Sequence, residues 1–294
     1  MAFRTVCLRS RCKLEVELNY LVIRGEKNVR ILMDEISTLI VASTQVSLTA
    51  AAISRLMDHH VKIIFCDGRW NPQGEVIPYA GNYNASGNLL EQIGWSKENK
   101  DILWKTIIKA KLTRQAYVLK KNSNLDMAKL LYEYIDSVVD GDATNREGLG
   151  AKVYFESLFG LGFQRRRDSD ERNTFLNYGY SIILSAVSRE IATAGYCLQL
   201  GIHHIGATNP FNLACDFVEP LRPLVDMYIV QNKVNKENFK KVFNSMLEAE
   251  VKIAGRTCFL DNAIKSYVNS LLGSLKDGDW SQIRMIRPID DEQL

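Results

Sequence analysis

The stretch "GRWNPQGEVIPYAGNYNASGN" (residues 68–88) marks a change in the pattern of this sequence. It is dense in glycine, asparagine and proline, which interrupt regular helices and strands. Before it, the chain has the patterns of β-strands; after it, apolar residues recur at helical spacing. We therefore expect an α+β protein with a small β-rich N-terminal domain (residues 1–80), a linker (81–96) and a larger all-α C-terminal domain (97–294).

The first 80 residues contain several segments that favour strands. "KLEVEL" (13–18) alternates apolar and charged residues, as a half-buried strand does, and "ISTLIVAS" (36–43) is rich in β-branched residues. A further strand, "VKIIFC" (61–66), follows a helix expected over residues 48–60, with Ser47 as its cap. Strand edges in such a domain need covering, so we expect it to form a homodimer.

Three long helices are predicted after the linker, over residues 100–122, 144–160 and 176–201. Gly160 and Gly201 stand where helices commonly end. In the first of these helices Trp104, Ile108 and Leu112 form an apolar stripe that is typical of a buried core.

The amino-acid composition excludes some classes of protein but does not indicate a particular function. The 294 residues include 46% hydrophobic and 24% charged residues, which is ordinary for a globular protein. No run approaches the roughly 18 apolar residues that a membrane span needs. The N-terminus lacks the apolar core of a signal peptide, and the six cysteines are scattered. We expect a cytoplasmic protein without disulfides.

The net charge of +3 does not exclude nucleic acid, because binding depends on local basic strips. The candidates for contact with DNA phosphates are Arg165, Arg166, Arg167, Lys105 and Lys109. The alternative for each is an ordinary solvated surface.

Glu147 is the first candidate for chemistry. In a helix it shares an apolar stripe with Ala151, Tyr154 and Leu158, so its carboxylate points toward the buried side and needs a partner. Thr144 followed by Glu147 also matches a capping box. A metal ligand, a helix cap and a buried ion pair all remain open for this residue.

A second group lies in "HHIGATNPFNLACDFVEPLRP" (203–223). His204 comes just after an expected helix end, in a loop where functional groups often lie, although a lone loop histidine is more often a structural, hydrogen-bonded residue. Asp216 and Glu219, three residues apart, share a face in a helix, or act as a helix cap and its third residue. Arg222 could pair with Asp226 across one turn.

Together, two carboxylates and one imidazole suit Mg²⁺ or Mn²⁺, with the histidine favouring Mn²⁺. Such an ion polarises a phosphodiester and stabilises the leaving oxygen. Spacing alone does not bring the three segments together.

Three blocks of this sequence resemble a known family: "NREGLGAKVYF" (145–155), "LNYGYSIILSAVSREIATAGY" (176–196) and "GIHHIG…NLACDFVEPLRPLVD" (201–226). They look like the signature blocks of the Cas-one family, the integrase and metal-dependent DNA endonuclease of CRISPR spacer acquisition, an antiviral defence. The N-terminal half follows the family's strand, helix and strand order. The length and the stretch around Trp95 look most like the type II-A branch.

The resemblance implies a β-rich dimerisation domain, a helical catalytic domain and a metal site formed by Glu147, His204 and Glu219. Many members have aspartate in the third position, whereas this chain has Glu219, which is common in the type II-A branch. Asp216 is then either a residue that supports a metal ligand without binding the ion or an alternate ligand.

The implied activity is the joining of prespacer 3′-hydroxyl ends to the CRISPR repeat by transesterification. The implied partners are double-stranded DNA (prespacer and repeat), a Cas-two dimer in a heterohexamer and other type II-A adaptation proteins. The alternatives are a free-standing metal-dependent nuclease acting on branched DNA and a non-catalytic DNA-binding scaffold.

Overall fold

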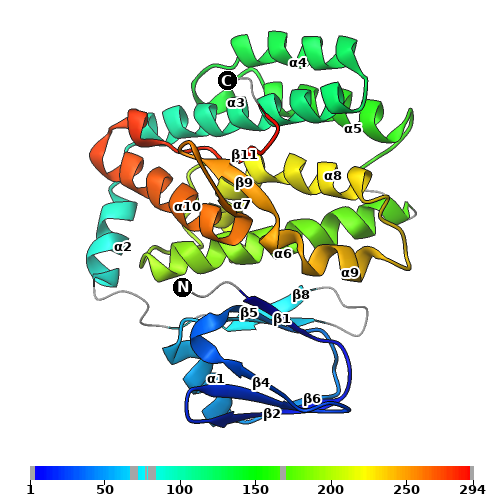
Figure 1. Cartoon of the computed structure of the whole chain (residues 1–294). Coiled ribbons are helices and arrows are strands. Elements are labelled where there is room, and N and C mark those ends of the chain that lie inside the picture. The colour runs from blue at the N-terminus through cyan, green and yellow to red at the C-terminus, as the bar shows by residue number, and fades with distance from the viewer. Residues whose placement is uncertain (1–3, 67–71, 77, 79–83, 166–169, 292–294) are drawn as a thin grey trace.

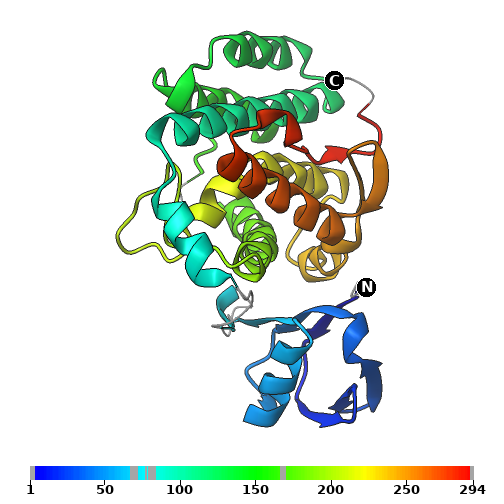
Figure 2. The same ribbon diagram turned by 90° about the vertical axis from the view of Figure 1, so that its left-hand side faces the viewer.

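The computed structural model describes residues 4–66, 72–76, 78, 84–165 and 170–291 (Figure 1). A β-rich N-terminal region lies at one end of the molecule and a larger helical region at the other, in both views (Figures 1 and 2). This confirms the expected α+β fold class and the order of its two parts.

The described part of the N-terminal domain contains two four-stranded sheets and a helix. One sheet has the order β1-β5-β7-β8 and the other the order β4-β3-β2-β6. The bounds are β1 (Arg4–Leu8), β2 (Cys12–Glu17), β3 (Tyr20–Arg24), β4 (Val29–Leu32), β5 (Ile36–Val41), β6 (Val46–Leu48), α1 (Ala50–Asp58), β7 (Lys62–Cys66) and β8 (Pro72–Val76), with the short turn η1 (Met33–Glu35) between β4 and β5.

Strand β5 is central and buried along its whole length, which explains its continuous apolar and β-branched run. It pairs in parallel with β1 on one side and β7 on the other. Helix α1 begins two residues later than expected, because Leu48 still belongs to β6 and Thr49 is the cap, its side chain accepting from the Ala52 amide at 3.1 Å.

The helical domain is built around the long helix α3 (Lys97–Lys121). Its other helices and short 3-10 turns are α2 (Ala85–Ile93), α4 (Leu125–Asp136), η2 (Asp140–Asp142), α5 (Arg146–Phe159), α6 (Glu171–Thr193), α7 (Asn212–Val218), η3 (Glu219–Leu221), α8 (Arg222–Gln231), α9 (Phe239–Asn244), η4 (Met246–Glu248), α10 (Leu260–Asp277) and η5 (Trp280–Gln282). It also contains a small antiparallel sheet of β9 (Glu250–Ile253), β10 (Arg256–Phe259) and β11 (Arg287–Pro288).

Two features differ from the expectation. Helix α2 lies inside the segment expected to be a linker, and the small sheet lies inside the part expected to be all-helical. Both elements are short, and short apolar runs do not distinguish a strand from a helix by periodicity.

Helix α5 approaches α3 closely at Gly150, and this contact positions the site described below. A Cβ atom at Gly150 would lie 2.3 Å from Cδ2 of Leu112, whose side chain is fully buried. Only glycine leaves room for this approach.

Helix α6 faces the N-terminal domain in both views (Figures 1 and 2). Its Arg189 guanidinium donates to the backbone oxygen of Ser37 and to Oγ1 of Thr38, both at 3.1 Å, and to Asp261 of α10 at 2.7 Å. Ser185 donates to Glu75 of β8 at 2.8 Å. Buried polar contacts therefore join the two domains.

Two expectations about the whole chain can be compared with the structure. No cysteine pair forms a disulfide in the described part of the chain. Among the described residues, no helix combines the length and the apolar character needed to cross a membrane.

Candidate active site

Glu147 projects from the first turn of α5, and other groups cap that helix. Asn145 is the cap and accepts from the Gly148 amide at 3.2 Å. The Asp142 carboxylate accepts from the amides of Arg146 and Glu147 at 2.9 and 3.0 Å. The capping-box interpretation of Glu147 is therefore wrong: its Oε1 atom instead accepts from Nζ of Lys111, at 2.7 Å.

Glu219 is buried where the short helix α7 ends and η3 leads into α8, with only 4% of its surface exposed. Its Oε2 atom accepts from the same Lys111 ammonium at 2.6 Å, and its Oε1 atom accepts from Nε of Arg222 at 2.8 Å. The structure thus brings Glu147 and Glu219, which are far apart in the sequence, to one point on α3.

His204 lies in the loop between α6 and α7, and Asp216 of α7 holds it there. Nδ1 of His204 is 2.6 Å from Oδ1 of Asp216. The Asp216 carboxylate also accepts from the backbone amides of Ile202, His203 and His204, at 2.7, 3.2 and 3.0 Å. Asp216 lies within α7 and is fully buried, so its expected role as a helix cap is wrong.

The loop that carries His204 is tightly folded. A Cβ atom at Gly201 would lie 2.2 Å from the backbone oxygen of His204, so this position requires glycine for close packing and not as a helix end. His203 does not point toward Asp216; its ring stacks on Trp104 with centroids 4.0 Å apart. With Nδ1 of His204 held by a carboxylate, Nε2 is the ring nitrogen left for another partner.

The charges in this cluster stabilise one another. Burial alone would raise the pKa of Glu219, but the positive charges of Lys111 and Arg222 outweigh it and lower that pKa to about 2. Burial likewise opposes the charge of Lys111, yet the two glutamates raise its pKa. The hydrogen bond with Asp216 raises the pKa of His204 despite its partial burial, and the charges of Glu219 and Glu147 add to the effect.

The donor set fits a hard divalent cation, because it offers two carboxylates and an imidazole. In the part of the chain that the structure describes, no three such side chains lie in a ready metal-binding group. A cation is nevertheless already shared by the two carboxylates, namely the Lys111 ammonium. The cluster is therefore built to bind positive charge.

Arg222 holds Glu219 from the other side. Its guanidinium lies 4.8 Å from the ring centre of Tyr180, and the Tyr180 hydroxyl donates to buried Asp226 at 2.5 Å. Tyr154 of α5 donates to the same carboxylate at 2.9 Å. The expected pairing of Arg222 with Asp226 is wrong, because Arg222 pairs with Glu219.

Neither Lys111 nor the contact of Arg222 with Glu219 was predicted from the sequence. The sequence did contain an indication for Lys111. This lysine continues the buried stripe of Trp104 and Ile108 on α3, and a buried ammonium needs a partner of opposite charge. Nothing in the sequence identified that partner, since the glutamates come from distant segments.

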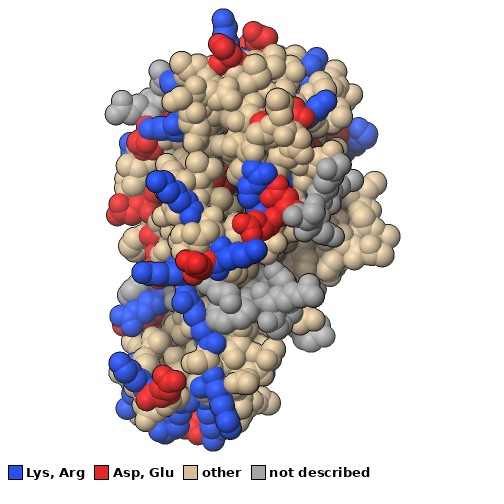
Figure 3. Space-filling model, turned by 90° about the vertical axis from the view of Figure 1, so that its right-hand side faces the viewer, with Lys and Arg blue, Asp and Glu red and all other residues tan. Residues whose placement is uncertain are grey.

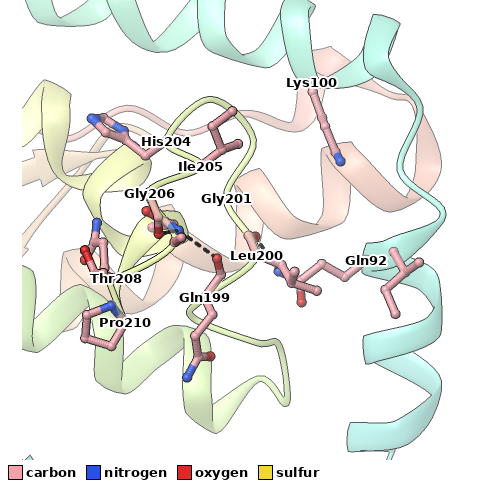
Figure 4. A pocket seen from close by; sticks show the side chains of 14 residues that line it. Gln92, Lys100, Gln199, Leu200, Gly201, His204, Ile205, Gly206, Thr208 and Pro210 are labelled. Carbon is pink, nitrogen blue, oxygen red and sulfur yellow. Dashed lines mark hydrogen bonds between the residues drawn. The ribbon is translucent and has the colours of Figure 1, made fainter.

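A pocket of about 590 Å³ opens beside His204. Figure 4 shows His204 on one side of it and Lys100 of α3 and Gln92 of α2 on the opposite side, with Gln199 below. Asn212 donates to the backbone oxygens of Gln199 and Gly206, both at 3.0 Å, which shapes the wall. The imidazole is thus reachable from solvent, with 38% of its side chain exposed.

The candidates for DNA contact have varied surroundings. Arg165 donates to the side-chain oxygens of Asn173 and Asn177 and stacks on Tyr180, so it has a structural role. Lys105 is 2.9 Å from Asp140, and Lys109 is half-buried on α3. The two other arginines of that run, Arg166 and Arg167, lie outside the described residues.

Exposed basic side chains also occur on the N-terminal domain, including Arg9, Arg11, Lys27 and Arg30. Figure 3 shows lysine and arginine gathered over the lower part of one face, which is this domain. No DNA contact was predicted for this domain from the sequence.

Known proteins are similar to this chain in sequence and fold. Residues 6–268 match the family described as CRISPR associated protein Cas1, the Cas-one family. The CRISPR-associated endonuclease Cas1 of Neisseria meningitidis is 31% identical, over 100% of this chain and 99% of that protein. A CRISPR-associated endonuclease Cas1 of Saccharolobus solfataricus is 26% identical over 74% of this chain and 70% of that protein.

Solved structures agree at the level of the fold. A casposase bound to an integration product matches with a TM-score of 0.76 at 20% identity, over 94% of this chain and 92% of the casposase. A Cas1 protein from Thermotoga maritima matches with a TM-score of 0.74 at 18% identity, over 92% of this chain and 97% of that protein. The family match spans most of the sequence, and the candidate site lies within it: this chain belongs to the Cas1 family.

Proposed function

We propose that this chain is a metal-dependent DNA integrase of CRISPR adaptation. The observation that carries the proposal is that the carboxylates of Glu147 and Glu219 both contact the Lys111 ammonium. His204 lies in the same domain, and the buried Asp216 carboxylate orients its ring. A scaffold that only binds DNA needs no such set of buried charges. The whole-length likeness to a Neisseria endonuclease and the fold shared with a casposase bound to an integration product support the proposal.

Glu147, His204 and Glu219 are the proposed ligands of Mg²⁺ or Mn²⁺. When bound, the ion polarises the phosphodiester and stabilises the leaving oxygen. Asp216 keeps the His204 ring in place through Nδ1, and Arg222 fixes Glu219 through Oε1. The pocket beside His204 gives DNA access to that imidazole.

The proposed reaction is a transesterification. The 3′-hydroxyl oxygen of a prespacer bonds to a phosphorus atom at the repeat boundary, while the bond from that phosphorus to the 3′ oxygen of the repeat strand breaks. The attacking hydroxyl loses its proton to solvent, and the leaving oxygen takes one up. No nucleotide cofactor is needed, because one phosphodiester replaces another.

The proposed assembly contains a homodimer through the N-terminal domain, a Cas2 dimer and DNA. One chain of a Cas6-RT-Cas1–Cas2 complex has the same fold, with a TM-score of 0.74 at 16% identity, over 99% of this chain and 36% of that one. This likeness of fold supports Cas2 as a partner. The participation of other type II-A adaptation proteins belongs to the same proposal.

A strand-transfer assay tests the function. The purified chain, with and without its Cas2 partner, is mixed with a labelled duplex and a plasmid that carries the repeat. We expect labelled ends to join the repeat boundary only with Cas2 and Mn²⁺ or Mg²⁺. A matched duplex with 3′-dideoxy ends should not join, because it lacks the attacking oxygen.

Two results would contradict the proposal. Cleavage of branched DNA without joining, regardless of Cas2, would indicate a free-standing nuclease. Binding that is equally strong in chelator, with no covalent product under any condition, would indicate a scaffold.

A further inference from the structure

Lys111 occupies the position that two proposed metal ligands share. Its ammonium donates to Oε1 of Glu147 at 2.7 Å and to Oε2 of Glu219 at 2.6 Å. The three residues come from α5, α3 and η3, so tertiary packing alone brings them together. Among the described residues, the ammonium contacts no other hydrogen-bond acceptor.

The charges of this cluster already balance. Lys111 and Arg222 are positive, Glu147 and Glu219 are negative, and all four form one connected set of contacts. Removing Lys111 would leave the carboxylates without one of their two cations in a site where Glu219 is almost fully buried. A divalent cation added to the intact set would meet two positive charges, and like charges at this distance repel strongly when they are buried.

Lys111 and Arg222 differ in how firmly they are held. Arg222 is fixed by its contact with Tyr180 as well as by Glu219. Lys111 carries a compact charge on a flexible four-carbon stem, and its ammonium is bound only by the two carboxylates within the described chain. Lys111 is therefore the cation that can leave while the ligands stay in place.

We propose that Lys111 is an internal counter-cation of the metal site: it holds Glu147 and Glu219 together when no metal is bound and moves out when a divalent cation binds. This inference rests on the proposed function, since it requires a metal at this site. It assigns Lys111 a positioning role that also sets metal affinity, because the ammonium and the metal compete for the same two oxygens.

A purely structural ion pair is the competing interpretation. Buried ion pairs often contribute little net stability, because desolvation offsets the attraction. A structural pair would stay formed after metal binding, so its loss would destabilise the metal-free and metal-bound proteins equally. The two interpretations therefore differ in how metal changes the effect of one substitution.

The test compares Lys111→Met with the wild-type full-length chain, using Mn²⁺ as the probe. In chelator, we expect the variant to have a lower Tm, because the buried carboxylate of Glu219 and the partly buried one of Glu147 lose their shared cation. In saturating Mn²⁺, its Tm should return close to that of the wild type in Mn²⁺. Calorimetric titration should give a Kd for Mn²⁺ that is roughly tenfold lower than in the wild type, because one positive charge has been removed from the site.

Two further variants sharpen the comparison. Lys129→Met removes an exposed lysine on α4 and should change neither the Tm shift nor the Kd. In chelator, the double variant Lys111→Met/Glu147→Gln should have a higher Tm than Lys111→Met alone, because Glu219 is then the only charged glutamate left where the ammonium was bound. An unchanged Tm in the double variant would overturn the inference.

A measurement on the wild type covers the case in which Lys111→Met does not fold. Reductive methylation of lysines is followed by mass spectrometry with and without Mn²⁺. We expect labelling of Lys111 to rise several-fold with Mn²⁺ while that of Lys129 stays constant; no change at Lys111 would refute displacement.

Failure of the two proposals can be told apart. If the wild type binds no Mn²⁺ and gains no Tm, the proposed function fails as well. If the wild type binds Mn²⁺ but Lys111→Met shows the same Tm shift and Kd, only this inference is wrong.

Discussion

His204→Ala is expected to lower the rate of strand transfer by roughly a hundredfold or more, because losing only an outer-shell partner of a metal ligand already costs about 10–100-fold. The fold should survive, since the side chain lies in a loop and is 38% exposed. The free energy of unfolding should therefore fall by less than about 1 kcal/mol. The rate is measured with labelled duplex ends in Mn²⁺, and the stability by urea unfolding.

His203→Ala is the matched control, because it removes the same side chain one residue earlier in the same loop. His203 stacks on Trp104 and does not contact Asp216 through its ring, so its loss should change the transfer rate only a few-fold. The assignment would be wrong if His203→Ala stopped transfer and His204→Ala did not.

Asp216→Ala is expected to have the largest effect on stability. The fully buried carboxylate accepts from the amides of Ile202, His203 and His204 as well as from the imidazole. Removing it leaves several buried donors unpaired, which should cost about 3 kcal/mol or more. Transfer should also be lost, because nothing then holds His204 in place.

Asp216→Asn separates the two effects. The asparagine side chain keeps the shape of the aspartate and one acceptor oxygen, so the loss of stability should be smaller than in Asp216→Ala. Its NH₂ group cannot accept a hydrogen bond from the imidazole or from the backbone amides, so strand transfer should still be impaired. Glu237→Ala, which removes an exposed carboxylate, is the control and should leave the urea midpoint unchanged. Wild-type stability in Asp216→Ala would contradict the role assigned to this residue.

The sequence predicted the larger features of the fold because they follow from local patterns. The run "ISTLIVAS" contains β5, which is buried throughout, and the change of pattern within residues 68–88 separates the strands of the N-terminal domain, which end with β8, from the helices that begin with α2. The ends of elements were harder to place. Helix α6 was expected over 176–201 but runs from Glu171 to Thr193, because Asp170 caps it and Gly195, with a φ of 82°, ends the turn.

The residues beyond α6 explain that error in physical terms. Leu198 and Ile202 are buried, so they continue an apolar pattern although the chain has left the helix. Periodicity records burial, and a loop that packs its apolar side chains inward resembles a helix by this measure.

The sequence indicated candidate residues for the site but not the contacts that they make. Glu147 was identified by its place on an apolar stripe, and the structure gives it a buried cationic partner. That partner, Lys111, lies 36 residues away in the sequence from Glu147 and 108 from Glu219. Such pairs arise from the packing of α3 against α5 and η3, which no local pattern encodes.

The central claim is that Glu147, His204 and Glu219 bind one divalent cation. Crystals of the full-length chain soaked in Mn²⁺ and measured at the manganese absorption edge test it most directly. We predict an anomalous peak in contact with all three side chains. No peak at this point, or a peak bound only elsewhere on the chain, would contradict the claim.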